Sequence, residues 1–313
     1  MCEESSRLGV TVDQTDSGAT LVDAGIKAEG GFLAGEVVAE ICLAGYGRAT
    51  VTPVQYGDII LPSVFIQTDH PALSLLGSQF AGWQIKGEDY SAIASGPARA
   101  LALKPKNLYT KLNHKEQSDV AVIVLETEKT PPESVIEQIA LKCNVSTKNL
   151  FIVMFSTTSV TGATQVSGRV VETGLHKLER LELDLLNVKH AWGYAPIVPV
   201  HPNSGEAMGR TNDAILYGGV TNYTVNYDDE VALEKIVRQA PSSSSEFLKE
   251  AKRLSQKSPR FMDIFKEAGF DFYNIDTNIF APAVVAITNA NTGKTFQAGN
   301  LDIDVLKTSL GIA

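Results

Sequence analysis

Hydrophobic positions recur along the first part of the chain at two spacings, one typical of strands and one typical of helices. Short apolar runs at 19–25, 49–54 and 58–68 predict strands. Residues 31–45, GFLAGEVVAEICLAG, predict a helix that ends at a glycine, and residues 70–83 predict another helix followed by a turn. Strand and helix therefore alternate from the start of the chain.

The same alternation continues in a segment that contains a complete strand, helix and strand unit. A helix is expected over 95–103 with Ser95 as its N-cap. Residues 119–126 then predict a buried strand, residues 131–144 an amphipathic helix, and residues 149–155 a second buried strand. Such a unit indicates an α/β segment with some parallel pairing.

The second half of the chain has the same alternation in a more polar setting. STTSVTGATQ, residues 156–165, predicts a hydroxyl-rich turn that leads into a helix over 167–183. The later predictions are a strand at 192–200, an element at 210–219, a strand at 222–227, a helix at 228–240, an exposed loop at 241–253, a segment at 261–276 and a hairpin at 284–299. We therefore expect a mixed α/β protein with two domains, 1–150 and 151–313, that can share segments around a deep cleft.

Composition and charge exclude several classes of protein. The 313 residues are 44% hydrophobic and 20% charged, which is ordinary for a folded protein. No run approaches the roughly 20 apolar residues of a membrane span, and the first residues, MCEESSRLGV, lack the pattern of a signal peptide. We expect a cytoplasmic protein with reduced cysteines. The net charge of -9 argues against sequence-independent nucleic-acid binding.

Three chemically active side chains share one face of the helix predicted over 167–183. Arg169, Glu172 and His176 are spaced three and four residues apart, with apolar positions around them. An exposed intrahelical ion pair is one interpretation of Arg169 and Glu172. The other is a catalytic pair, because the helix follows a hydroxyl-rich turn at the end of a buried strand, where open α/β sheets place their sites.

Other short patterns support weaker interpretations. Glu172 and His176 have the spacing to share a metal ion, but other ligand candidates are few, so we expect no metal. A serine nucleophile within 156–159 would need the surroundings of a G-x-S-x-G elbow, which this chain lacks. Ser156 and Thr157 are therefore expected to cap a helix or contact a substrate.

Six longer segments resemble one enzyme family, in the family's order along the chain. The chain is similar to the methenyltetrahydromethanopterin cyclohydrolases through ICLAGYG (41–47), TDHPALSLLGSQFAGW (68–83), SGPARAL (95–101), GRVVETGLHKL (168–178), MGRTNDAILYGG (208–219) and FYNIDTNIFAPA (272–283). Ala94 departs from the pattern, since glycine usually precedes the SGPAR motif. This departure affects only a local turn.

The resemblance implies a cytoplasmic, metal-free homotrimer that has no permanently bound cofactor and takes a tetrahydromethanopterin derivative as its substrate. The implied reaction is the reversible hydrolysis of the methenyl bridge to the N5-formyl form. The family's catalytic arginine and glutamate correspond to Arg169 and Glu172. Glu172 would activate water and Arg169 would orient the carboxylate. A noncatalytic pterin-binding protein on the same fold is the alternative.

Further residues are expected to contact the substrate. Ser95, Gly96 and Arg99 in the SGPAR motif are expected to hold an anionic group of the substrate's tail through backbone N–H groups and the guanidinium. Asn212 and Asp213 offer the mixed donors and acceptors that a pterin edge needs. Lys86 is expected to reach a phosphate or carboxylate.

Overall fold

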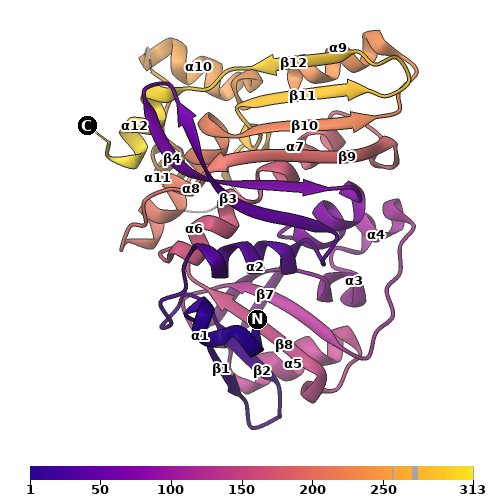
Figure 1. Cartoon of the computed structure of the whole chain (residues 1–313), viewed down its shortest axis with the longest axis vertical. Helices are drawn as coiled ribbons and strands as arrows, with labels where there is room; N and C mark the ends of the chain where they lie inside the picture. Colours follow the sequence, from indigo (N-terminus) through magenta and orange to yellow (C-terminus); the bar gives the residue numbers. More distant parts are fainter. Residues whose placement is uncertain (256, 270–273, 313) are drawn as a thin grey trace. The chain divides into compact units, whose positions relative to one another are not determined.

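A computed structural model of the chain describes residues 1–255, 257–269 and 274–312 (Figure 1). It confirms a mixed α/β fold, and the chain separates into two compact units. Residues 1–49 and 72–165 form the first unit, and residues 50–71 and 166–313 form the second. This division differs from a single boundary near residue 150. Residues 50–71 join the second unit because strand β4 (Ile59–Thr68) pairs with β9 (Val188–Pro196) there.

The first unit contains a mixed sheet whose described strands follow the order β1, β2, β8, β7, β6, β5. Strands β2, β8 and β7 run parallel to one another, which confirms the parallel pairing expected from the strand, helix and strand unit, whereas β1 and β6 are antiparallel to the strands beside them. The strands are β1 (Thr11–Gln14), β2 (Thr20–Asp23), β5 (Trp83–Gly87), β6 (Tyr90–Ser95), β7 (Ala121–Glu126) and β8 (Leu150–Phe155). The helices are η1 (Cys2–Glu4), α1 (Ser5–Leu8), α2 (Phe32–Cys42), η2 (Ala72–Gln79), α3 (Ala98–Ala102), α4 (Lys106–Leu112), α5 (Glu133–Cys143), η3 (Thr147–Asn149) and α6 (Val160–Ser167).

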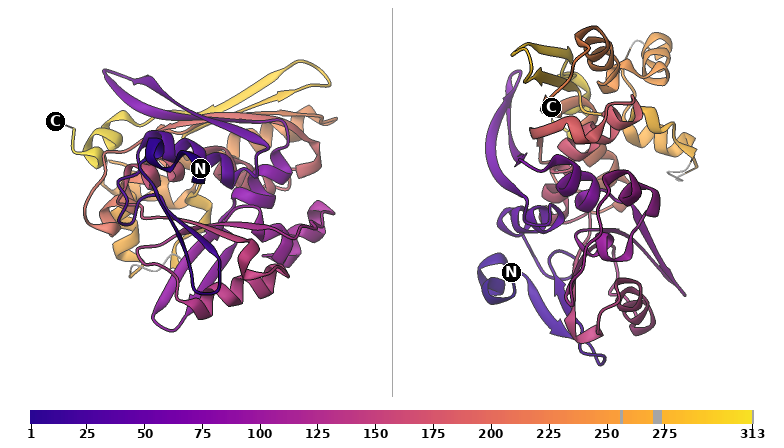
Figure 2. Two further views of the ribbon diagram at one scale, coloured as in Figure 1. Left: turned by 60° about the horizontal axis from the view of Figure 1, so that its bottom comes forward. Right: turned by 90° about the vertical axis from the view of Figure 1, so that its right-hand side faces the viewer.

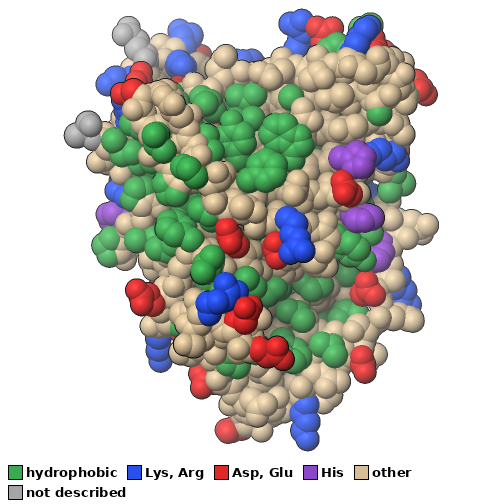
Figure 3. Space-filling view, in the orientation of Figure 1, with side chains coloured by type: hydrophobic (Ala, Val, Ile, Leu, Met, Phe, Trp, Pro, Cys, Tyr) green, Lys and Arg blue, Asp and Glu red, His purple; other side chains and the backbone are tan. Residues whose placement is uncertain are grey.

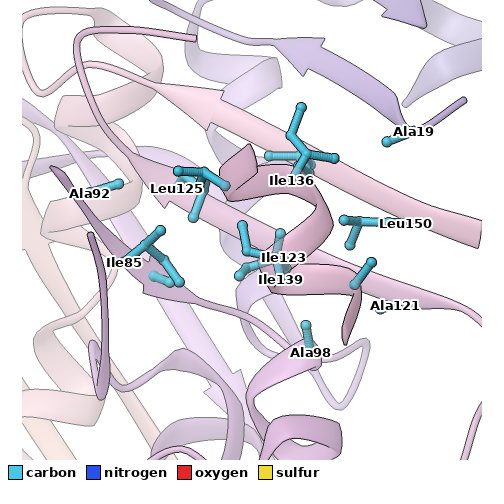
Figure 4. Close-up of a cluster of buried hydrophobic side chains, with 14 of the residues drawn as sticks. Ala19, Ile85, Ala92, Ala98, Ala121, Ile123, Leu125, Ile136, Ile139 and Leu150 are labelled. Atoms are coloured by element: carbon cyan, nitrogen blue, oxygen red, sulfur yellow. The ribbon is translucent and has the colours of Figure 1, made fainter. Parts of the chain in front are cut away.

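The core of the first unit forms between α5 and one face of this sheet (Figure 4). Ile136 and Ile139 of α5 lie against Ile123, Leu125 and Leu150 of the parallel strands, and all five are almost completely buried. Burying one such side chain contributes about 1.5 to 3 kcal/mol. The period of α5 and alternate residues of β7 and β8 are thus explained by one shared core, and the runs are continuous because Val124 and Val153, on the opposite face, are also buried.

The second unit contains a sheet with the described strand order β12, β11, β10, β9, β4, β3. Strands β10 and β11 pair in parallel, whereas β9 is antiparallel to both β10 and β4. The remaining strands are β3 (Gly47–Tyr56), β10 (Val220–Val225), β11 (Val284–Asn289) and β12 (Thr295–Gly299). The helices are α7 (Val170–Arg180), η4 (Leu185–Asn187), α8 (Ser204–Gly218), α9 (Glu230–Gln239), η5 (Ser242–Ser244), α10 (Glu246–Ser255), α11 (Phe261–Glu267), η7 (Thr277–Ile279) and α12 (Ile303–Leu310).

The two faces of the second sheet differ in what covers them. Helices α7, α8 and α9 pack on one face, and the right-hand view of Figure 2 shows them on one side of the strands. On the other face Phe65 and Trp192 stack with their ring centroids 6.0 Å apart, and Trp192 is 39% exposed. In Figure 3, hydrophobic side chains gather over the strands of this second sheet. Tyr194, which pairs with Phe65, and Asn222, which pairs with Trp192, are also uncharged.

Several predicted elements need correction. Residues 160–167 form α6 rather than a turn, and residues 246–255 form α10 rather than an exposed loop. Ser95 ends strand β6 and does not cap a helix, since α3 begins after Pro97. The helix predicted at 70–83 is a π-helix over Ala72–Gln79. Residues 270–273, in the segments predicted at 261–276 and matched at 272–283, lie outside the described residues.

A buried carboxylate joins three helices of the second unit. Asp213 of α8 is 1% exposed. One of its oxygens accepts the backbone N–H of Phe261 at 2.7 Å, at the start of α11, and the other accepts the Ser309 hydroxyl of α12 at 2.6 Å. Burial raises the pKa of Asp213 to about 7, although these two hydrogen bonds oppose the shift. Asp213 therefore ties α11 and α12 to α8.

This environment predicts a specific pH dependence of stability. Between pH values of about 4 and 7 the folded protein keeps a proton on Asp213 that the unfolded chain releases, so the free energy of unfolding falls as pH rises. Asp213→Asn removes this contribution. The free energy of unfolding of Asp213→Asn, minus that of the wild type, should therefore rise by about 1 to 4 kcal/mol between pH 4 and pH 8. Urea unfolding at several pH values measures it.

Ser309→Ala is the matched control, because it removes a hydrogen bond but leaves the titrating carboxyl group in place. Its stability difference from the wild type should lack the upward trend expected of Asp213→Asn. A difference between Asp213→Asn and the wild type that stays constant over this pH range would contradict the buried, proton-binding carboxylate.

Candidate active site

Helix α7 presents an apolar side to the sheet of the second unit. Val170, Val171, Leu175 and Leu178 are completely buried, as the helical spacing of these residues requires. The helix packs on β9 and β10. Just before it, the Ser167 hydroxyl donates to the backbone carbonyl of Pro196 at 2.8 Å. The helix predicted at 167–183 is confirmed with the shorter bounds Val170–Arg180.

Arg169 and Glu172 lie together at the beginning of α7. Arg169 is the N-cap residue, with helical φ and ψ of −78° and −2°. Its Nη1 atom lies 3.9 Å from Oε2 of Glu172, and the two side chains are only 9% and 7% exposed. This distance is too long for a direct hydrogen bond, so the contact is a pairing of charges. The exposed ion pair is therefore wrong as an interpretation of these residues.

Burial makes the Arg169–Glu172 pair energetically costly. Removing a guanidinium and a carboxylate from water costs several kcal/mol per ion, and only close, well-bonded geometry recovers that energy. A separation of 3.9 Å does not provide such geometry within the pair. Buried charged groups of this kind are typical of functional sites.

The structure adds two polar residues around α7 that the sequence analysis did not identify. Lys177 is buried and donates from Nζ to the carbonyl of Asn278 at 3.0 Å. Burial lowers the pKa of Lys177, the charge of Arg180 lowers it further, and Asp276 opposes both. The helical spacing from Val170 and Gly174 to Lys177 indicates that it lies on the buried face.

Tyr223, the second residue, is completely buried in the middle of β10 and donates to the Val171 carbonyl at 2.7 Å. The alternation of β10 indicates that Tyr223 points inward. No sequence spacing connects it with α7, because the two partners are 52 residues apart.

The chemistry available at α7 is proton transfer next to a fixed positive charge. A carboxylate such as Glu172 can accept a proton from water, and the guanidinium of Arg169 lies beside it. His176 is half-buried one turn further along. Among the described residues, no group of three or more His, Cys, Asp or Glu side chains is arranged to hold a metal ion. The metal interpretation of Glu172 and His176 thus gains no support.

The SGPAR residues of the first unit have internal partners. Gly96 adopts a φ of +95°, and its N–H group donates to the Ser78 carbonyl at 2.9 Å, so this N–H is not available as expected. Arg99 is completely buried and donates to the carbonyls of Leu76, Ser78 and Lys104 at 2.9 to 3.1 Å. The guanidinium thereby supports the end of the π-helix η2. Substrate contacts from Ser95, which is buried, and from Gly96 and Arg99 remain predictions.

Ser156 and Thr157 follow β8 at the carboxyl end of the parallel strands. Thr157 donates to Oε1 of Glu126, which ends the neighbouring strand β7, at 2.6 Å. The Ser156 hydroxyl shares a 2.8 Å hydrogen bond with the Thr158 hydroxyl. A hydroxyl is not the base that a serine nucleophile requires. Lys86 is exposed on β5, which is the last described strand on its side of the sheet.

Asn212 and Asp213 are neighbours on α8 but differ in surroundings. The half-buried Asn212 side chain donates from Nδ2 to the Met208 carbonyl at 2.9 Å, within its own helix. Both oxygens of Asp213 accept hydrogen bonds from α11 and α12. The structure thus brings Arg169 and Glu172 together, whereas Asp213 is joined to other helices of the same unit. Contacts of Asn212 and Asp213 with a pterin stay predictions.

Comparison with known proteins agrees with the resemblance noted in the sequence. A family model described as "Cyclohydrolase (MCH)" matches residues 1–310. A methenyltetrahydromethanopterin cyclohydrolase of Methanothermobacter marburgensis is 42% identical over 100% of this chain and 96% of its own length. An enzyme of the same name from Methanocaldococcus jannaschii is 41% identical over 99% of this chain and 94% of its own. No described helix has the length and apolar character needed to cross a membrane. The chain belongs to the methenyltetrahydromethanopterin cyclohydrolase family.

Proposed function

We propose that this protein reversibly hydrolyses the methenyl bridge of 5,10-methenyltetrahydromethanopterin to the N5-formyl derivative, with Glu172 and Arg169 as its catalytic residues. Family membership supports the reaction. The observation that supports the two roles is the buried pair at the start of α7, with both side chains less than one-tenth exposed. No permanently bound cofactor is required.

The substrate supplies its own electrophile in this mechanism. The bridging carbon lies between two nitrogens and shares their delocalised positive charge. Water adds to this carbon, and Glu172 accepts one of the water's protons as the new C–O bond forms. Glu172 then returns that proton to N10 as the C–N10 bond breaks, and the hydroxyl of the intermediate loses its proton to solvent as the formyl group forms. The net reaction consumes one water and releases one proton.

Arg169 has an orienting role in the same mechanism. Its charge holds the carboxylate in one direction, which fixes the lone pair that faces the water. Because the substrate is a cation, a guanidinium next to it would repel it, so we propose that Glu172 lies between Arg169 and the substrate.

The remaining contacts are proposed as substrate-positioning groups. Lys86 supplies an exposed cation, and the Ser156 and Thr157 hydroxyls and the Asn212 amide supply neutral polar groups. Ser95, Gly96, Arg99 and Asp213 complete the proposed set. The last four carry weaker support, because they are buried in the protein and, except for Ser95, have the internal hydrogen bonds described above.

Glu172→Gln provides the direct test of the proposed base. The substitution keeps the size of the side chain but removes its ability to accept a proton, so kcat should fall by about 10² to 10⁴ while substrate still binds. Turnover is followed by the loss of methenyl absorbance, and the melting temperature is measured on the same protein. Arg169→Ala should also lower kcat, because the carboxylate loses its fixed direction. A Glu172→Gln enzyme within threefold of the wild type would end the catalytic assignment.

We expect activity to survive exhaustive chelation. The reason is chemical, since a cationic amidine carbon does not need a metal ion to polarise it. The measurement is turnover after prolonged treatment with a strong chelator, with metal analysis of the same sample. A stoichiometric ion whose removal abolishes turnover and whose return restores it would refute the metal-free mechanism.

We also propose a cytoplasmic homotrimer, as the family resemblance implies. The uncharged part of the sheet face around Phe65 and Trp192, which borders the exposed His190–Asp69 pair, supports contact between copies, because copies that each carry a net charge of -9 associate best through a neutral surface. Sedimentation equilibrium at micromolar concentration should give three times the mass of one chain, and Trp192→Arg should shift the protein toward smaller species. A monomeric wild type would contradict the proposal.

A further inference from the structure

Helix α7 lies close against the sheet at Gly174. A Cβ atom built on this residue would lie 2.1 Å from the Tyr223 hydroxyl oxygen and 3.1 Å from Cγ of Pro282. Glycine inside a helix costs up to about 1 kcal/mol relative to alanine. Only glycine leaves room for the Tyr223 hydroxyl against the helix backbone at this position.

The Tyr223 hydroxyl lies under the first turn of α7. Tyr223 occupies the middle of β10, where it is in register with Ala191 of β9 and Ile287 of β11, so its backbone is fixed by strands on both sides. Its hydroxyl donates to the Val171 carbonyl at 2.7 Å. Val171 directly precedes Glu172, so this bond connects the sheet to the turn that carries the carboxylate.

The hydroxyl remains a donor at every working pH. Burial raises the pKa of Tyr223 far above its ordinary range, the neighbouring Thr221 opposes the shift, and the negative charge of Glu172 adds to it. Glu172 is thus close enough for its charge to act on Tyr223. A protonated Tyr223 keeps its hydrogen bond to the helix while Glu172 gains and loses protons.

We propose that Tyr223 is a positioning residue for the Glu172 carboxylate. Its hydroxyl, seated in the space left by Gly174 and bonded to Val171, fixes both the rotation of α7 and its height above the sheet. A rotation of the first turn would move Glu172 away from the water that it activates. Displacement of a reacting group by about 1 Å can lower a rate by about 10². This inference rests on the proposed catalytic role of Glu172.

Tyr223→Phe is the first test, because it removes only the hydroxyl and keeps the ring in the core. We expect kcat to fall roughly tenfold, KM to stay within twofold, and the melting temperature to fall by a few degrees. Tyr217→Phe is the matched control. Tyr217 of α8 is also buried and donates to the Pro259 carbonyl at 2.5 Å, a bond that does not involve α7. Its loss should lower the melting temperature similarly but leave kcat within twofold.

The space at Gly174 provides a second test, in which the melting temperature of each variant is measured beside kcat. Gly174→Ala alone should reduce kcat by about 10² or more, because the new methyl group displaces α7 from the Tyr223 hydroxyl. When Tyr223 is already Phe, the same substitution should reduce kcat much less, since the 2.1 Å contact with the oxygen is gone and only the contacts with Pro282 Cγ at 3.1 Å and the ring Cζ at 3.2 Å remain. The two effects are then strongly non-additive.

Glu172→Gln separates the two possible failures. If that variant is inactive but Tyr223→Phe keeps kcat within twofold of the wild type, the positioning role is wrong and the proposed function stands. Additive effects of Gly174→Ala and Tyr223→Phe would equally overturn the positioning role. If Glu172→Gln remains active, the catalytic assignment fails, and the positioning role falls with it.

Discussion

The cost of keeping two opposite charges out of water is the constraint on which the site depends. Arg169 and Glu172 are both buried, yet their closest charged atoms are 3.9 Å apart. An arrangement that served stability alone would favour shorter bonds or apolar replacements. The pair persists in the folded protein only if the surrounding backbone holds the first turn of α7 in place. The neighbouring strands supply that support.

Support for the site comes from ordinary elements of the second unit. Strands β9 and β10 lie under α7, and a glycine on each side allows a close approach. Gly193 of β9 is one example, since a Cβ atom there would lie 3.0 Å from a methyl group of Val171. Together with the Ser167 bond to Pro196 and the Lys177 bond to Asn278, these contacts fix the helix along its length.

Buried polar residues elsewhere in the chain stabilise the fold through internal hydrogen bonds. Arg99 binds carbonyls at the end of a π-helix in the first unit, and Asp213 joins three helices in the second. Both lie in segments that resemble the enzyme family, and both were expected to contact substrate. Their internal bonds account for their burial without any ligand. A motif shared with the family can therefore contain residues that stabilise the fold as well as residues that contact the substrate.

Much of the fold could be predicted because the hydrophobic residues of its helices and strands recur at clear helical or strand spacings. The apolar runs at β7 and β8 and the amphipathic face of α5 specify a parallel unit with a shared core. Hydroxyl-rich sequences were harder to interpret. Residues 160–167 form a helix in which the Thr161 and Thr164 hydroxyls donate to the backbone carbonyls of residues 31 and 160, contacts that composition does not reveal. The serines at 242 and 245 are buried, which local composition does not reveal.

The site could be predicted only in part. The spacing of Arg169 and Glu172 follows from the sequence, but their burial depends on strands that pair far along the chain. The contact between Tyr223 and Val171 spans 52 residues, and no local pattern indicates which helix a buried tyrosine will meet. Long-range packing therefore determines whether the pair is a surface ion bridge or part of a buried site.

The central claim is that Arg169 and Glu172 act as one catalytic unit, and a double-mutant cycle on kcat tests it most directly. The four proteins are the wild type, Arg169→Met, Glu172→Gln and the double variant, all measured by loss of methenyl absorbance. If the arginine works only through the carboxylate, the double variant should be no more than about threefold slower than Glu172→Gln alone. Losses that multiply, so that the double variant is slower by the full product of the single effects, would contradict a shared role.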